Sequence, residues 1–170
     1  METMVLTFDS GKRQKMTRRR MVASVGALLL SAGISTAKAT ESIVVHKDPN
    51  CGCCSGWARH LRDAGFTVAI DETTDVRAIR NRLGVPDELA ACHTAEMAGY
   101  VIEGHVPAAA VRRLLGERPD AVGLAVAGMP LGSPGMQGAP EPYVVVLFGK
   151  FGKCDYMSFR GTEVQGIRQG

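Results

Sequence analysis

Three cysteines stand within four consecutive positions of this chain, at Cys51, Cys53 and Cys54. Packing gives no reason for this crowding, because side chains so close in sequence cannot all face one hydrophobic core. Cys51 and Cys53 are also too close along the chain for an unstrained disulfide. Thiolates gathered in this way serve mainly to bind a soft metal ion or to exchange disulfides. The cluster therefore predicts sulfur chemistry.

The spacing of the cluster favours metal binding over redox exchange. Cys51 and Cys54 have the C-x-x-C spacing of thiol oxidoreductases, in which Cys51 would attack and Cys54 would resolve. Such a pair leaves Cys53 idle, whereas a Cu(I) site gains a ligand from it, and bridging thiolates let several Cu(I) ions share few cysteines. We predict Cu(I) binding, and a redox pair or a structural disulfide with Cys92 or Cys154 remains open.

A second pair of metal-binding side chains, Cys92 and His93, lies in a polar connector. Alone this pair would be weak evidence for a site. Together with the cysteine cluster, it predicts that a second segment of the chain supplies ligands to one metal centre. Cys92 would be a ligand, and His93 would be a ligand or a hydrogen-bond partner of sulfur. Zinc bound by Cys51, Cys54, Cys92 and His93, in a structural module, is a further alternative.

Met129 and Met136 stand seven residues apart in a loop rich in glycine and proline. They do not belong to an apolar periodic stretch, as core methionines usually do. A thioether is a soft ligand for Cu(I), and a methionine can equally pack over a cluster as a hydrophobic lid. Both interpretations place this loop near the metal centre.

Three other residues of metal-binding type are interpreted more simply. His46 and His105 are predicted to be surface or structural histidines rather than ligands, although both remain open as ligands. Cys154, in a predicted strand, is interpreted as a buried and inert thiol.

The chain lacks the motifs of several enzyme classes. It has no G-x-S-x-G, no phosphate-binding glycine loop followed by Lys-Ser/Thr, and no H-E-x-x-H. Asp71 and Glu103 have no acid–base partner that the sequence identifies. We therefore expect a binding protein rather than an enzyme, with copper oxidoreductase activity left open.

The N-terminus has the pattern of a secretory signal peptide over residues 1–39. A basic run is followed by an apolar stretch at residues 21–34 and by Ala37-Lys38-Ala39, which predicts cleavage before Thr40. The apolar stretch is short for a membrane span, although a retained anchor is an alternative. Residues 17–21 resemble a twin-arginine signal, and Met16 is an alternative start. We expect export to the periplasm through the Sec or twin-arginine route, without stable membrane insertion after cleavage.

Removal of the signal peptide changes the net charge of the chain, and export bears on the state of its cysteines. The whole chain carries +3, but residues 1–39 hold seven Lys/Arg and two Asp/Glu, so the mature part, with 13 basic and 15 acidic residues, carries −2. No basic surface is left to suggest nucleic-acid binding. All five cysteines lie in the mature part. An oxidising compartment favours disulfides, but an odd number leaves at least one thiol unpaired.

The mature chain, residues 40–170, is predicted to be one α/β domain. Strands are expected at residues 42–47, 66–71, 99–103, 123–127, 143–148 and 153–160, and helices at residues 55–64, 75–83 and 107–115. Residues 85–97 and 128–142 are expected to be connectors, and the last ten residues are expected to lack an element. This order predicts parallel pairing of the first two strands. It favours a thioredoxin-like fold, with a mixed sheet, helices on both faces, a C-terminal β-hairpin, and a cis-proline at Pro130 or Pro142.

Four motifs in order resemble the bacterial CopG-like family, formerly a domain of unknown function. They are H-K-D-P-N-C-G-C-C at residues 46–54, C-H-T at residues 92–94, G-Y-V-I-E-G-H-V-P at residues 99–107, and the methionine loop at residues 128–136. The resemblance covers residues 42–160.

The resemblance implies a periplasmic, thioredoxin-like copper-binding protein linked to copper resistance. It implies copper ligands at the family's cysteine positions, which are Cys51, Cys53, Cys54 and Cys92 here. The positions of Met129, Met136 and His105 also recur in the family motifs, without an assigned contact to metal. Sequestration, transfer or redox buffering of copper would be the role, including electron transfer between Cu(I) and Cu(II). Other periplasmic copper-handling proteins would be the partners.

Overall fold

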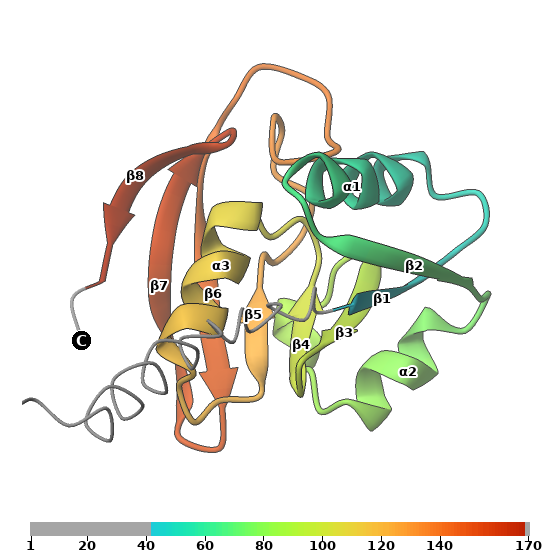
Figure 1. Ribbon diagram of the computed structural model, residues 1–170, viewed down its shortest axis with the longest axis horizontal. Coiled ribbons are helices and arrows are strands. Elements are labelled where there is room, and N and C mark those ends of the chain that lie inside the picture. The colour runs from blue at the N-terminus through green and yellow to red at the C-terminus, as the bar shows by residue number, and fades with distance from the viewer. Residues whose placement is uncertain (1–41, 169–170) are drawn as a thin grey trace, which may run out of the picture. The chain divides into compact units, whose positions relative to one another are not determined.

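The computed structural model describes residues 42–168, so the predicted signal peptide lies outside the described residues. The elements, shown in Figure 1, are β1 (Ser42–Lys47), α1 (Gly52–Asp63), β2 (Thr67–Glu72), α2 (Val76–Arg82), the 3-10 helix η2 (Asp87–Leu89), β3 (His93–Met97), β4 (Tyr100–Glu103), α3 (Ala108–Glu117), β5 (Gly123–Ala125), β6 (Pro142–Gly149), β7 (Gly152–Arg160) and β8 (Glu163–Ile167). Within residues 42–168, no helix has the length and apolar character needed to cross a membrane.

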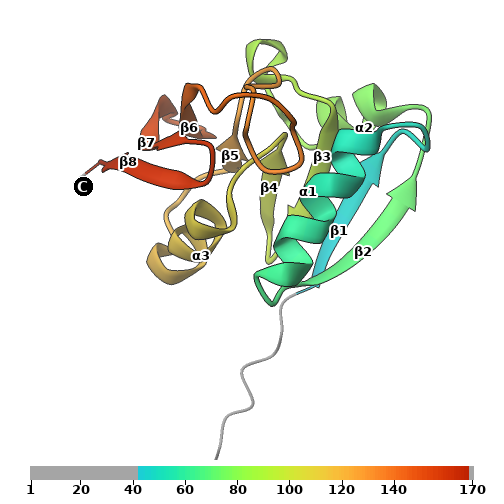
Figure 2. The ribbon, with the colours of Figure 1, turned by 90° about the horizontal axis from the view of Figure 1, so that it is seen from above.

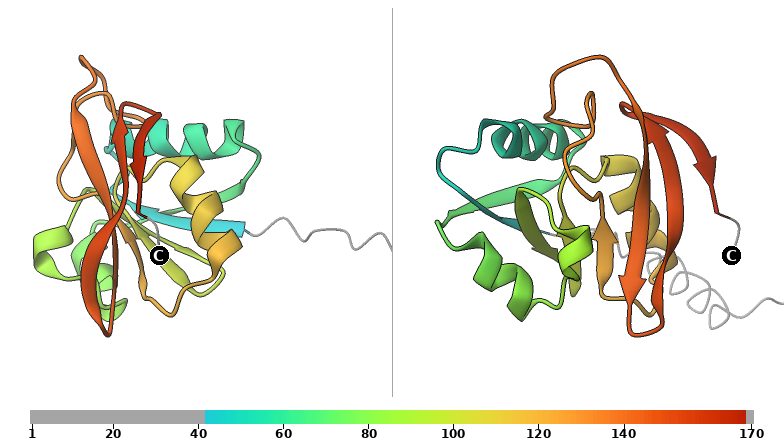
Figure 3. Two further views of the ribbon diagram at one scale, coloured as in Figure 1. Left: turned by 90° about the vertical axis from the view of Figure 1, so that its left-hand side faces the viewer. Right: turned by 180° about the vertical axis from the view of Figure 1, so that it is seen from behind.

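The eight strands form one mixed sheet in the order β2-β1-β3-β4-β5-β6-β7-β8. Two pairs are parallel, β1 with β2 and β4 with β5, and each is joined by a helical crossover, α1 or α3. The other neighbours pair antiparallel. Helices α1 and α3 cover one face of the sheet and α2 lies on the other, as the left view of Figure 3 shows. The α/β class, the mixed sheet and the parallel first pair are therefore confirmed.

Alternating burial along the strands separates two hydrophobic cores. Ile102 of β4 joins the larger core beneath α1 and α3, whereas the adjacent Val101 joins a smaller core on the opposite face. Trp57 of α1 is fully buried in the larger core, and its indole Nε1 donates a hydrogen bond to the Val106 carbonyl at 2.8 Å. This bond ties the cysteine-bearing helix to the segment that leads into α3.

His60 of α1 provides a cap for α3. Its Nε2 accepts a hydrogen bond from the Ala108 backbone N–H at 3.1 Å, at the start of α3, so the imidazole must be neutral. Burial lowers the pKa of His60 below its usual 6.5, and Arg112 lowers it further against an opposing effect of Asp63.

Removing this cap is expected to produce a pH-dependent loss of stability. His60→Ala should lose about 1 kcal/mol in urea unfolding at pH 7.5. Because the folded pKa is lowered, the contribution of His60 is complete above pH 6.5 and is lost as the pH falls through the folded pKa. The difference between wild type and variant should therefore shrink at pH 5. His60→Gln, which can accept but does not titrate, serves as the control, and a difference independent of pH would contradict this role.

Two strands were missed by the sequence prediction. Residues 85–97 were predicted to be a connector, but β3 begins at His93 and pairs antiparallel with both β1 and β4. Its sequence, H-T-A-E-M, shows no clear alternation of apolar and polar residues, so the pattern did not indicate a strand. The strand forms because β1 and β4 pair with the backbone on both of its sides. The last ten residues were predicted to lack an element, but β8 pairs with β7 as a mostly exposed edge strand.

The hairpin of β6 and β7 is confirmed, although β8 extends it to three strands. No peptide bond in residues 42–168 is cis, so the expectation of a cis-proline at Pro130 or Pro142 was wrong. The thioredoxin-like assignment stays a prediction.

Candidate metal centre

A tight turn delivers the first cysteine to the start of α1. The Asn50 backbone N–H donates to the Asp48 side chain at 2.8 Å, and the Cys51 N–H donates to the Asp48 carbonyl at 3.0 Å. Cys51 is the N-cap of α1, with Cys53 and Cys54 in its first turn, so α1 begins three residues earlier than predicted. All three side chains therefore lie at the positive end of the helix dipole, which favours negative charge.

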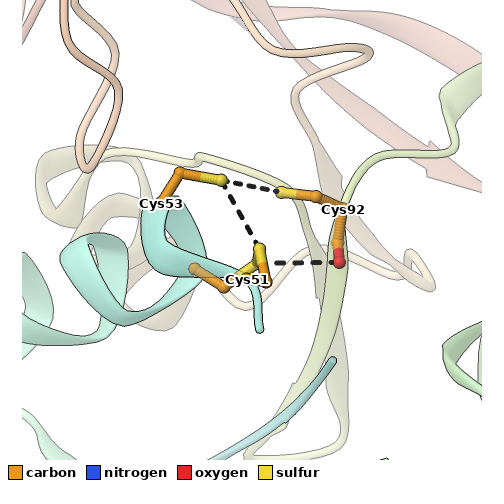
Figure 4. A group of neighbouring side chains, drawn as sticks. Cys51, Cys53 and Cys92 are labelled. Carbon is orange, nitrogen blue, oxygen red and sulfur yellow. Dashed lines mark hydrogen bonds between the residues drawn. A yellow bond between two sulfur atoms is a disulfide. The ribbon is translucent and has the colours of Figure 1, made fainter. Parts of the chain in front are cut away.

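Four sulfur atoms converge at this end of α1. The Sγ atoms of Cys51, Cys53, Cys54 and Cys92 all lie within 4.8 Å of one another. The Sγ of Cys53 is 3.5 Å from that of Cys51 and 3.9 Å from that of Cys92, and Figure 4 shows these sulfurs pointing toward one another. Residues 39 positions apart thus meet in one cluster.

Cys51 and Cys54 form a disulfide in this structure, and Cys53 and Cys92 are free thiols. This disulfide joins the two cysteines of the C-x-x-C pair. The alternative of a structural disulfide to Cys92 or Cys154 is not what the structure contains. The cluster therefore has an oxidised form with two thiols, and reduction of the disulfide would give it four.

A buried ion pair fixes the segment that carries Cys92. Glu103 is fully buried, and its carboxylate accepts from Arg80 Nε at 2.8 Å, the Ala91 N–H at 2.7 Å and Thr94 Oγ1 at 2.5 Å. Arg80 also donates to the Ala91 carbonyl at 2.5 Å. Burial raises the pKa of Glu103, against the lowering effects of Thr94, Ala91 and Arg80. The sequence identified no partner for Glu103, because its partners come from three other segments.

Two buried imidazoles face the Cys92 sulfur. His105 Nε2 lies 3.0 Å from Cys92 Sγ, and His93 Nδ1 lies 3.4 Å from the same atom. The other ring nitrogen of His105, Nδ1, donates to the Pro134 carbonyl at 2.6 Å. Since a carbonyl only accepts, the proton of the neutral ring stays on Nδ1, and the lone pair of Nε2 points at sulfur.

The surface alternative for His105 was wrong, because the residue is fully buried beside the Cys92 sulfur. Its position follows from strand pairing, because Thr94 of β3 lies opposite Glu103 of β4. The residues just before Thr94 and just after Glu103 therefore come to the same end of the two strands. If β3 had been predicted, its pairing with β4 would have indicated that His105 lies near Cys92.

Burial keeps Cys92 protonated at sulfur, and it keeps His93 and His105 neutral. Desolvation, followed by the nearby Cys53 thiol, raises the pKa of Cys92 to about 12. Desolvation, with His105 adding to it, lowers the pKa of His93 to about 3, and desolvation also lowers the pKa of His105. A metal ion bound at Cys92 must therefore displace the thiol proton.

His93 is held by aromatic packing. Its ring centroid lies 4.4 Å from that of Trp57 and 5.2 Å from that of His105, which it meets edge to face. The side chain is fully buried, and His93 Nε2 has no hydrogen-bond partner within residues 42–168. The packing sets the ring orientation that directs Nδ1 toward Cys92.

The methionine loop passes beside α1 in Figures 1 and 2, and its Gly135 approaches Cys53 and Trp57 in the first two turns of that helix. Gly135 has φ +89°, and a Cβ at this position would lie 2.4 Å from the Cys53 carbonyl oxygen and 2.5 Å from the Trp57 nitrogen. Met129 is 55% exposed and Met136 is half-buried. The loop is therefore near the cluster, and ligand roles for the two methionines stay predictions.

Gly135→Ala is expected to push this loop away from α1. The close approach and the positive φ should together cost about 1–3 kcal/mol of unfolding free energy, measured by urea denaturation. Gly128→Ala is the matched control, because Gly128 has φ +70° with no neighbouring atom within 4 Å. Equal losses in both variants would show that backbone strain alone acts, and that the contact with α1 contributes nothing.

Two further residues can be compared with their sequence interpretation. His46 is buried and engages both ring nitrogens, with Asp71 at 2.7 Å and Glu96 at 3.0 Å, which agrees with the predicted structural histidine. Asp71 therefore has a partner, and His46 presents no free nitrogen. Cys154 is half-buried rather than buried.

Comparison with known proteins shows which family the chain belongs to. A family model described as "Protein of unknown function, DUF411" matches residues 89–136. A solved structure named copper resistance protein CopG, form 2, is 43% identical with a TM-score of 0.67, and the match covers 70% of this chain and 98% of that one. Form 1 is 44% identical with a TM-score of 0.66, covering 71% and 98%. No match is found among the curated proteins. This chain belongs to the CopG-like copper resistance family.

Proposed function

We propose that the mature chain is a periplasmic copper-binding protein with a thioredoxin-like scaffold. In its reduced form it binds Cu(I) through the thiolates of Cys51, Cys53, Cys54 and Cys92. The names of the similar structures support a copper-related role, and the predicted signal peptide supports export. Sequestration, transfer or redox buffering of copper, together with other copper-handling proteins, is the role that this binding serves.

The observation that carries the proposal is the meeting of Cys92 with the cysteines of α1. Cys92 comes from the start of β3, yet its sulfur lies 3.9 Å from that of Cys53. Four sulfurs within 4.8 Å of one another make a donor set that suits Cu(I), and bridging thiolates allow more than one ion. The residues present therefore fit the metal that the family name implies.

The surrounding residues have defined parts in this proposal. Two electrons and two protons from an external dithiol open the Cys51–Cys54 disulfide and complete the set of four thiols. The Arg80–Glu103 pair holds the segment before Cys92 in place. His93 and His105 are hydrogen-bond partners or ligands beside the sulfur, and the loop with Met129 and Met136 covers the cluster.

A Cu(I) competition titration tests the proposal. Under anaerobic conditions, the reduced protein should hold Cu(I) against a strong chelator, and the form with the Cys51–Cys54 disulfide should hold less. Cys53→Ser should lower the affinity by about 100-fold, because a thiolate ligand contributes more than a residue that only supports one. Unchanged affinity in Cys53→Ser, or in the disulfide form, would refute the assigned ligands.

The Cys51–Cys54 disulfide favours one competing function, a thiol–disulfide oxidoreductase. In that function Cys51 attacks a substrate disulfide and Cys54 resolves the mixed disulfide. An insulin-reduction assay separates the two functions. Metal-independent turnover that survives Cys53→Ser would support the oxidoreductase, and absence of turnover would support copper binding.

A further inference from the structure

The two edges of the eight-stranded sheet differ in how well they resist pairing with another chain. β8 forms one edge, and its pairing with β7 is interrupted by a register shift between Ser158 and Phe159. Such irregularities are a common protection of edge strands. β2 forms the other edge, and its six residues pair with β1 without interruption. Figure 2 shows β2 as the outermost strand on that side. The β2 edge is therefore regular enough to accept a further strand.

The backbone groups on the open side of β2 belong to alternate residues. The Thr73 N–H donates to the Lys47 carbonyl of β1 at 2.9 Å, so the backbone of Thr73 faces β1. The direction of the backbone groups alternates along a strand. The N–H and C=O groups of Val68, Ile70 and Glu72 therefore point away from β1. They form the row of donors and acceptors that a neighbouring strand needs.

Two apolar side chains of β2 lie beside a groove on the α1 face of the sheet. Val68 lies opposite Ile43 of β1, Ile70 lies opposite Val45, and both β1 residues belong to the larger core. Val68 packs partly against that core, whereas Ile70 is 37% exposed. The groove has a volume of about 470 Å³ or less and accepts apolar side chains from an added strand. It is lined by Lys47, Ser55, Ala58, Arg62, Ile70 and Glu72.

β2 is complementary to itself when two copies pair antiparallel with Ala69 on the two-fold axis. Val68 of one copy then lies opposite Ile70 of the other, and the reverse pair forms on the other side of the axis. Both residues have outward backbone groups, so both pairs are hydrogen-bonded. Ala69 meets its own copy in a non-hydrogen-bonded pair, where the Cα atoms approach to about 4.5 Å and a small side chain fits. The same residues thus supply main-chain bonds and apolar cross-strand contacts.

The charges at the edge are complementary in the same register. Glu72 of one copy comes beside the segment of the other copy just before Val68. Arg62 reaches this segment, because it donates to the Val68 carbonyl at 3.0 Å. Each copy therefore brings an arginine near a glutamate of the other. Asp71 comes opposite Thr67, so the acidic ends of the two strands stay apart.

We propose that the β2 edge is an interface between two copies of this chain, which join their sheets through an antiparallel pairing of β2 about a two-fold axis at Ala69. A second copy is the occupant because β2 complements itself in hydrogen bonds, apolar pairs and charge. The interface shares no residue with the proposed copper ligands and does not depend on copper binding. Its failure would therefore leave the proposed function unaffected.

Disulfide trapping tests the register. In Ala69→Cys the two introduced thiols would face each other across the axis, and air oxidation of the mature chain should give a cross-linked dimer on a non-reducing gel. Thr67→Cys is the matched control, because Thr67 is also exposed and shares the same face of β2. Its own copy lies about 13 Å away along the strand. Ala69→Cys should give about 10-fold more dimer than Thr67→Cys or the wild type, whose native thiols set the background.

Sedimentation equilibrium tests the association without an introduced cysteine. The mature wild-type chain should show a monomer–dimer equilibrium. Ile70→Lys should weaken it by about 10-fold or more, because a lysine on an edge strand opposes strand addition. Val164→Lys, at an exposed apolar residue of the opposite edge, should leave it unchanged.

Three results would overturn the pairing of two copies. One is a chain that stays monomeric at every concentration, which would leave the edge to an extended segment of another protein. Another is an equal effect of Ile70→Lys and Val164→Lys on the association. The third is equal cross-linking of Ala69→Cys and Thr67→Cys, which would show random collision rather than a fixed register.

Discussion

Replacing Cys92 by serine is expected to lower the Cu(I) affinity of the reduced protein by about 100-fold or more. Cys92 is the one thiol of the cluster that does not belong to the start of α1, and its sulfur lies 3.9 Å from that of Cys53. Serine offers a hard oxygen in place of soft sulfur, which Cu(I) binds poorly. Competition against a chelator under anaerobic conditions measures the effect.

Cys154→Ser is the matched control for this prediction. Cys154 is also a free thiol, but it lies on β7 and does not belong to the four-sulfur cluster. It is half-buried, so serine should fit without large structural change. We expect unchanged Cu(I) affinity in this variant. Similar losses in Cys92→Ser and Cys154→Ser would indicate nonspecific binding to thiols and would contradict the assigned site.

Arg80→Met is expected to lower the unfolding free energy by about 3–5 kcal/mol. The substitution leaves the carboxylate of Glu103 fully buried without its cation, and it also removes the hydrogen bond from Arg80 to the Ala91 carbonyl. Because Ala91 immediately precedes Cys92, the cysteine should become more mobile. Urea denaturation measures the loss of stability, and the rate of Cys92 alkylation reports the loosened segment.

Arg82→Met provides the comparison, because Arg82 also lies on α2 and also pairs with a glutamate. Its partner is Glu96, at 3.6 Å, and both side chains are largely exposed. Solvent screens such a pair, so the loss should be about 0–1 kcal/mol, with no change in the alkylation rate of Cys92. A small loss in Arg80→Met would mean that the buried pair contributes little and that other contacts hold the segment before Cys92.

Sequence reasoning identified the sulfur cluster and most of the elements, because both depend on local patterns. Hydrophobic periodicity over a few residues predicted β1, α1 and β2. The helical connection between the two strands predicted the parallel pairing of β1 with β2. The crowding of Cys51, Cys53 and Cys54 is visible in the chain itself and needs no fold to indicate sulfur chemistry.

The contacts that complete the site depend on partners distant in sequence, and only the tertiary structure decided them. The polar strand β3 is stable because β1 and β4 pair with both of its edges, and its register brings His93 and His105 to one sulfur. Glu103 is buried because Arg80, Ala91 and Thr94 meet it there. Residue types thus determined which chemistry the chain can perform, whereas strand pairing and burial, which no short stretch encodes, decided which atoms meet.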